Sequence, residues 1–375
     1  MLIWALVGMV LIGVMLIDAF ETVVLPRRAT RKLRIARLVL LSTWYLWSAP
    51  ARGLWRSGER RETYLSYFGP LALLLLFVVW VAGLIGGFAL LLWGLRAPLV
   101  AGGGTSFWTT LYGSGTTFFT LGLGDVLPHT SLGRLLVTLE AGLGFGFLAL
   151  IISYMPVLTQ AFSQREVNVS LLDARAGSPP TAAELLRRHA GADFTEALAQ
   201  LFREGERWSA ELLESHLSYP LLAYYRSQHE QQSWLAGLTM ILDATALLQV
   251  GIDGAPTRSA RLAFAMARHA AADLSHILGT RPSSAAPARL PAAELARLRT
   301  MLVRAGVPLR EGPDADRMLG HLRQMYEPFV NALAERLLMP LPPWMPPPGA
   351  RDDAWKITAW GPATRSPEHD ETDGT

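Results

Sequence analysis

Two long apolar segments without charge constrain this chain more than any other feature. No Asp, Glu, Lys or Arg occurs from Thr63 to Leu95, or from Ala141 to Gln164. Each segment exceeds the roughly 20 apolar residues that a helix needs to cross a hydrocarbon core of about 30 Å. Only 17% of all residues are charged, against about 25% in soluble proteins. Because backbone polar groups in lipid must be satisfied internally, the sequence predicts an all-α membrane protein.

A third apolar segment covers residues 2–25 and contains only two charged residues, Asp18 and Glu21. A secretory signal peptide carries basic residues before its apolar part, whereas here they follow it. This order favours a retained first transmembrane helix over residues 1–26, with the N-terminus outside. We expect the basic residues after it to lie in the cytoplasm and to contact anionic lipid headgroups. They are Arg27, Arg28, Arg31, Lys32, Arg34 and Arg37.

The segment 27–64 connects the first span to the second. Its apolar part, residues 38–50, is too short to cross a bilayer and has arginines on both sides. This pattern favours a basic helix that lies at the cytoplasmic membrane surface. Asp18 and Glu21 are close in sequence to these arginines, so we expect ion pairs there. Sensing of protons or cations is the alternative interpretation of the two carboxylates.

Residues 96–131 leave and re-enter the same side of the membrane. Their central stretch, TSFWTTLYGSGTTFFT at 105–120, is too short and too polar to span the bilayer. It predicts a half-length helix that dips into the membrane. Irregular backbone at membrane depth is tolerated only where it is buried in protein or lines water. The sequence therefore predicts a re-entrant pore loop between the second and third spans.

The hexapeptide TLGLGD, residues 120–125, follows that short helix. Backbone carbonyls replace the water shell of a cation when successive carbonyls point to one side of the chain, and glycine permits the dihedral angles this requires. The hexapeptide resembles the T-x-G-[YF]-G-D signature of tetrameric potassium channels. The surroundings are also similar to bacterial two-span members of that family, including LPHTSLGRL at 127–135, and the resemblance covers about residues 65–163.

The resemblance implies a potassium channel that assembles as a homotetramer, because each chain carries one pore loop. K+ would be the permeant ion bound by the carbonyls of residues 120–124, and no other cofactor is expected. Asp125 would lie at the outer mouth. The implied selectivity filter comprises Thr120, Leu121, Gly122, Leu123, Gly124 and Asp125. Leu123 replaces the usual aromatic residue, so a weakly selective cation channel is the alternative.

Two groups of residues near the filter carry further expectations. Glu140 lies in the third span, where a carboxylate usually faces protein or water. By the resemblance it faces the pore helix or lies behind the filter. There it would accept hydrogen bonds from Thr116, Thr117 or filter amides, either as a structural brace or as part of filter gating. Gly144 aligns with the gating hinge of the family, and close helix packing is its alternative. Pro156 predicts a kink in the same helix.

The composition changes after the third span, and we expect a domain order of pore module (65–163), linker (164–180), cytoplasmic helical domain (181–339) and disordered Pro-rich tail (340–375). The glycine motifs of Rossmann and Walker A nucleotide sites are missing after residue 165. The ligands of regulators with those motifs are therefore not transferred to this domain.

One cluster in that domain has a spacing compatible with metal binding, namely His269, Asp273 and His276. Surface histidines explain it equally well. No nucleophile–base pair of specific spacing occurs, so we expect no enzyme activity and no nucleic-acid partner. The inner membrane of a bacterium is the expected location. A membrane-anchored helical sensor that does not conduct is the alternative from another class of protein. The gating stimulus is not specified.

Overall fold

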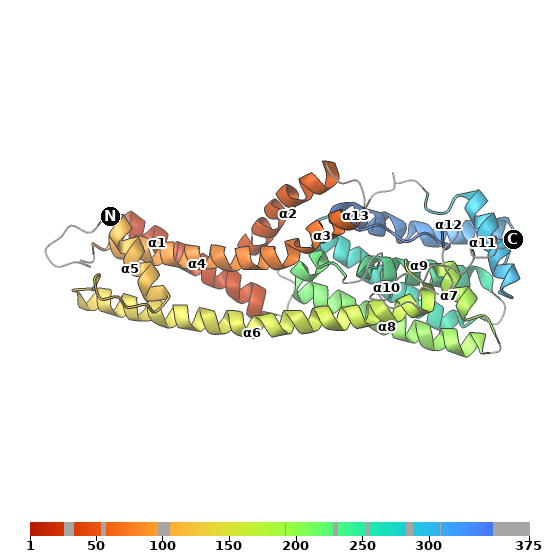
Figure 1. Ribbon diagram of the computed structural model, residues 1–375, viewed down its shortest axis with the longest axis horizontal. Helices are drawn as coiled ribbons and strands as arrows, with labels where there is room; N and C mark the ends of the chain where they lie inside the picture. The colour runs from red at the N-terminus through yellow and green to blue at the C-terminus, as the bar shows by residue number, and fades with distance from the viewer. Residues whose placement is uncertain are drawn as a thin grey trace, which may run out of the picture. The chain divides into compact units, whose positions relative to one another are not determined.

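The computed structural model describes residues 1–25, 34–53, 58–96, 106–191, 193–227, 232–252, 255–282, 288–307 and 309–347. Over these residues the protein is helical, and the only extended pairing is an isolated antiparallel bridge between Ile252 and Leu309 (Figure 1). The chain forms two compact units, the first comprising Met1–Gln164 and Glu214–Arg226 and the second Arg165–Leu213 and Ser227–Thr375. The predicted all-α membrane fold is confirmed.

The first unit contains the predicted spans. Its elements are α1 (Leu2–Ala19) with a π turn (Phe20–Val24), α2 (Ile35–Gly53), α3 (Glu59–Ser66), α4 (Phe68–Gly94), α5 (Phe107–Phe118) and the first part of α6 (Ser131–Ala176). Four described helical segments are long and apolar enough to cross a membrane: Leu2–Val24, Glu59–Gly94, Ser131–Ala176 and Trp234–Gly251. The first three agree with the spans expected from the sequence.

Helices α1 and α4 lie side by side and run antiparallel (Figure 1). Their backbones approach closely, because a Cβ atom on Gly94 would lie 2.3 Å from the Ala5 nitrogen, and one on Gly8 would lie 2.5 Å from the Gly87 carbonyl oxygen. Helices in lipid gain little from apolar burial against each other and associate through close packing of small residues. These glycines therefore hold the first span against the second.

Asp18 in α1 is 4% exposed and has a different partner from the one expected. Its Oδ2 accepts hydrogen bonds from the Trp80 indole nitrogen at 2.8 Å and from the Ala36 backbone nitrogen at 3.0 Å. The expected ion pair with an arginine was thus wrong for Asp18, because a helix N-terminus offers backbone N–H groups to a carboxylate. Glu21 does contact an arginine, with 3.7 Å between its Oε2 and the Arg34 Nε.

Helix α2 covers the segment predicted to lie at the membrane surface. Of the six basic residues expected to contact lipid, Arg34 precedes this helix and Arg37 lies in its first turn with an exposed side chain. The other four, Arg27, Arg28, Arg31 and Lys32, lie outside the described residues. Their contact with lipid stays a prediction.

The second unit is built around α9 (Trp234–Gly251). The surrounding helices are α7 (Ala182–Arg188), α8 (Phe194–Ser218), α10 (Thr257–Ile277), α11 (Ala292–Arg304), α12 (Pro313–Gln324) and α13 (Glu327–Leu337). Of the 18 residues of α9, 89% are buried inside the protein. Helices α7, α10, α12 and α13 contact α9. A helix that is apolar on all sides needs such a cover, so α9 is the core of this unit.

A buried ion pair fixes the arrangement around α9. Asp243 is fully buried, and its two oxygens accept hydrogen bonds from Arg289 at 3.0 and 2.7 Å and one from the Tyr326 hydroxyl at 2.5 Å. Burial disfavours charge on Arg289, but the adjacent Asp243 carboxylate raises its pKa above the ordinary value. The ionised pair is therefore satisfied inside the domain, by groups from outside α9.

The structure differs from two expected domain boundaries. Helix α6 continues to Ala176, so most of the expected linker at 164–180 is helical. The first part of the expected disordered tail is packed, since Trp344 is 1% exposed and its carbonyl oxygen accepts a hydrogen bond from the Ala183 nitrogen at 3.1 Å. Burial of this indole stabilises residues 340–347 against the domain despite their prolines. Residues 348–375 lie outside the described part of the chain.

Candidate ion-conduction site

Helix α5 is the predicted half-length helix. Its 12 residues span about 18 Å, roughly half of a bilayer core. The Ser106 hydroxyl accepts a hydrogen bond from the Trp108 nitrogen and caps the N-terminus, as serine favours. The helix lies between α4 and the beginning of α6 (Figure 1), and its C-terminal end leads directly into residues 120–125. A partial negative charge at that end is suited to a cation.

The chain leaves α5 through a Schellman motif. The Thr120 nitrogen donates to the Thr117 carbonyl oxygen at 2.9 Å, and the Leu121 nitrogen donates to the Thr116 carbonyl oxygen at 2.8 Å. Thr116 and Thr117 thus support the candidate filter through their backbones. The Thr116 hydroxyl donates a hydrogen bond to the Gly113 carbonyl oxygen at 2.9 Å. The expectation that these two threonines donate to Glu140 was wrong.

The backbone φ angle alternates in sign along residues 120–125. Positive φ angles occur at Thr120 (55°), Gly122 (58°) and Gly124 (82°), and not at the two leucines between them. A β-branched residue such as threonine rarely adopts a positive φ, and such outliers persist mainly at functional sites. When residues with positive and negative φ follow one another, successive carbonyl groups point to the same side of the chain. In an ordinary extended strand they point to opposite sides.

The carbonyl oxygens of this segment have no backbone partner. Among the described residues, no backbone hydrogen bond is donated or accepted by Gly122–Val126, and none is accepted by Thr120 or Leu121. Backbone polar groups in folded proteins are nearly always satisfied, so these oxygens require water, an ion or another copy of the chain. The side chains of Leu121 and Leu123 are 61% and 63% exposed in the single copy.

Asp125 at the end of the segment is exposed and interacts electrostatically with the Tyr112 side chain. Tyr112 belongs to α5, so this contact joins the outer end of the candidate filter to the short helix. Leu123 has no polar side-chain group for such a contact. The sequence analysis did not single out Tyr112, because the 12 positions between it and Asp125 include an irregular turn.

We expect Tyr112→Phe to lower the preference for potassium over sodium, because Asp125 then loses the hydroxyl that positions it. The measurement is the reversal potential with potassium on one side of a bilayer and sodium on the other. Tyr64→Phe is the control, since its hydroxyl donates to the Trp47 carbonyl oxygen at 3.2 Å, away from the filter. Equal reversal potentials for Tyr112→Phe and the unmodified chain contradict this role.

Glu140 in α6 is fully buried and faces the short helix α5, next to Ser114, which is 1% exposed. The Ser114 Oγ lies within hydrogen-bond distance of a Glu140 oxygen and 2.9 Å from the Ile85 carbonyl oxygen of α4. One serine hydroxyl therefore connects three helices. The expected location of Glu140 agrees with this geometry, but its partner is Ser114.

The proton count at this junction determines the form of Glu140. Ser114 has one hydroxyl proton, and both the Ile85 carbonyl and an ionised Glu140 only accept. If Ser114 donates to Ile85, the group is satisfied only when Glu140 carries a proton and donates to the Ser114 oxygen. The other Glu140 oxygen, Oε2, has no hydrogen-bond partner among the described residues. A neutral carboxylic acid fits a buried site in a span better than an unpaired carboxylate.

We therefore expect Glu140→Gln to retain stability to within about 1 kcal/mol, because the amide also donates to Ser114. Ser114→Ala leaves the Glu140 carboxyl buried without its partner, which costs about 1–3 kcal/mol. Thermal unfolding of the purified protein in detergent measures both. If Glu140→Gln destabilises as much as Ser114→Ala, Glu140 is ionised in the native state and the assignment of the proton is wrong.

Helix α6 approaches the end of α5 at Gly144. A Cβ atom there would lie 2.1 Å from the Phe118 carbonyl oxygen, whereas one at Gly142 or Gly146 would meet nothing within 4 Å. This supports the close-packing interpretation of Gly144, and its role as a hinge stays a prediction. Pro156 lies inside α6, which continues beyond it as one helix.

The metal-binding interpretation of the histidine cluster receives no support. His269 and Asp273 form a partly exposed pair with 3.7 Å between Nε2 and Oδ2. Among the described residues there is no group of three His, Cys, Asp or Glu side chains that holds a metal ion. Surface histidines on α10 account for the pattern.

Residues 74–160 match a family model described as "Ion channel". This match supports the assignment of this segment to the ion channel superfamily. It covers most of α4, all of α5, residues 120–125 and the part of α6 that carries Glu140 and Gly144. The match points to passive ion conduction and to transport in place of enzymatic catalysis.

A relative from Bacillus subtilis (strain 168), "Uncharacterized membrane protein YdjJ", is 25% identical over 216 residues. The aligned part is 56% of this chain and 61% of that protein, so the chain spans less than two thirds of the relative's length. Its name is consistent with the membrane helices described above. No solved structure matches the chain.

Proposed function

We propose that this protein is a potassium-selective channel in which four copies place residues 120–125 around one axis. The observation that carries the proposal is the alternation of positive and negative φ along this segment. Its carbonyl oxygens, in addition, accept no backbone hydrogen bond among the described residues. One segment cannot encircle an ion, so several copies must contribute oxygens to each K+ site. The exposed Leu121 and Leu123 side chains would then be covered by neighbouring copies.

The membrane topology belongs to the same proposal. The N-terminus lies outside, the second unit is cytoplasmic, and basic residues near α2 contact anionic lipid at the inner surface of the cell membrane. The inner helix or the filter gates the pore, and the cytoplasmic helices modulate it. This topology gives the candidate filter an outward position, as the order of span, short helix, loop and span requires.

The decisive experiment is the reversal potential of the purified protein in a planar bilayer with potassium on one side and sodium on the other. A value near the potassium equilibrium potential is expected, because fixed carbonyl oxygens replace the hydration shell of K+. Current with a reversal potential near zero identifies a weakly selective cation channel, the alternative suggested by Leu123. Absence of both current and rubidium flux from correctly folded protein favours a non-conducting sensor.

A further inference from the structure

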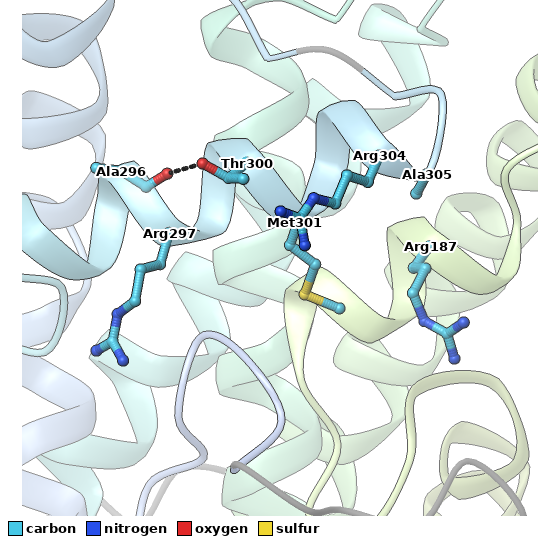
Figure 2. Close-up of a pocket in the computed structure, with 7 residues that line it drawn as sticks. All are labelled: Arg187, Ala296, Arg297, Thr300, Met301, Arg304 and Ala305. Atoms are coloured by element: carbon cyan, nitrogen blue, oxygen red, sulfur yellow. Dashed lines mark hydrogen bonds between the residues drawn. The ribbon is translucent and has the colours of Figure 1, made fainter.

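An arginine-lined pocket lies in the second unit, between the C-terminal end of α7 and one face of α11 (Figure 2). Its volume is about 610 Å³, within the range of roughly 300–1,000 Å³ for small-molecule sites. The lining residues are Arg187, Ala296, Arg297, Thr300, Met301, Arg304 and Ala305. Three of them are arginines and none is acidic.

The residues of α11 that line the pocket recur at helical spacing. Arg297, Thr300, Met301 and Arg304 are three, four and seven positions apart, so they share one face of the helix. Figure 2 shows the Arg297 and Arg187 side chains extending on either side of Met301. The pocket therefore has an apolar floor of Met301 with the two alanines, and cationic groups around it.

A carboxylate one turn earlier in α7 orients the Arg187 guanidinium. Its guanidinium forms a two-pronged contact with Glu184, at 2.8 Å from Nε and 2.7 Å from Nη2. The same carboxylate also accepts a hydrogen bond from the Arg188 Nε at 2.5 Å. Glu184 thus fixes the Arg187 guanidinium at this side of the pocket, where it offers N–H donors.

The α11 side of the pocket is cationic. Arg297 lies 3.5 Å from Glu294, in a pair whose side chains are 65% and 39% exposed, and such surface pairs stabilise little. Within the described part of the chain, no ion pair involves Arg304. Arg187 and Arg304 lie in the last turns of their helices, where a cation is favourable. Arg297 lies in the interior of α11, where that explanation does not apply.

We propose that this pocket binds a phosphate-bearing small molecule of about nucleotide size. Guanidinium groups present a planar fork of donors that matches phosphate oxygens, and the volume exceeds what inorganic phosphate alone fills. The methionine and alanine floor suits an apolar or planar part of the ligand. The site is separate from residues 120–125, so the proposal stands whether or not the protein conducts potassium.

The test is isothermal titration calorimetry of the full-length protein in nanodiscs of neutral lipid, with ATP, pyrophosphate and adenosine as probes. ATP and pyrophosphate are expected to bind, more weakly as salt increases, and adenosine to bind at least about tenfold more weakly than ATP because it lacks phosphates. Arg297→Gln and Arg304→Gln are each expected to weaken ATP binding about tenfold, as for the loss of one charged hydrogen-bonding group.

Arg317→Gln is the matched control, because Arg317 is an exposed arginine of α12 that pairs with Asp314 away from the pocket. It is expected to bind ATP like the unmodified chain. Thermal unfolding without ligand shows whether the variants remain folded. The proposal is overturned if neither phosphate compound binds, or if Arg317→Gln weakens binding as much as the pocket variants do. It is also overturned if only the headgroups of anionic lipid, in nanodiscs that contain it, occupy the site.

Discussion

Gly124→Ala is expected to reduce potassium conduction to background. Gly124 has a φ of 82°, and an L-residue in the left-handed region costs about 1–2 kcal/mol. In a tetramer the cost applies to four filter segments around one axis. The added methyl groups therefore favour a backbone in which the carbonyl oxygens no longer face the ion. Rubidium flux into liposomes measures the loss.

Gly13→Ala is the control for this experiment. Gly13 lies in the middle of α1, and a Cβ atom there meets nothing within 4 Å. Alanine favours helix over glycine by about 1 kcal/mol, so flux is expected to be unchanged. If Gly124→Ala conducts like the unmodified chain while Gly13→Ala also does, residues 120–125 are not the conduction path and the channel proposal fails at this site.

Gly144→Ala is expected to destabilise the pore module by about 1–3 kcal/mol, the usual cost of overpacking. The new Cβ atom would lie 2.1 Å from the Phe118 carbonyl oxygen, and this atom belongs to the backbone at the end of α5. Relief of the clash requires α5 and α6 to separate, which displaces the start of the candidate filter. Thermal unfolding in detergent and rubidium flux are both expected to decrease.

The same helix provides two matched controls, Gly142→Ala and Gly146→Ala. Neither Cβ atom meets another group within 4 Å in the single copy, so each variant is expected to keep the stability of the unmodified chain or to exceed it slightly. Equal losses in all three variants contradict the contact with Phe118. They indicate instead that glycine is required along this part of α6 for flexibility, as the hinge interpretation predicts.

Sequence reasoning was most successful where one physical constraint acts locally. Segments without charge such as 63–95 have to be helical in lipid, and the structure has helices there. The short polar stretch before Thr120 could only be a half-length helix, and α5 is one. Gly122 and Gly124 were expected to adopt unusual dihedral angles, and both have positive φ.

Sequence reasoning failed where the partner of a side chain depends on how two helices are rotated against each other. Ser114 and Phe118 are four residues apart on α5, as are Glu140 and Gly144 on α6, so each pair shares a helix face. These two faces meet, and Ser114 becomes the partner of Glu140 in place of the expected threonines. Nothing in the local pattern specifies that rotation.

The sequence by itself determined that the chain is a helical membrane protein and singled out six residues as its candidate filter, because lipid and backbone geometry restrict what such segments can do. Only the tertiary structure decided which distant groups meet. Asp18 binds Trp80 and not an arginine, and Arg187 joins the arginines of α11 around one pocket. Contacts between residues far apart in the chain depend on how helices cross, which short-range patterns leave open.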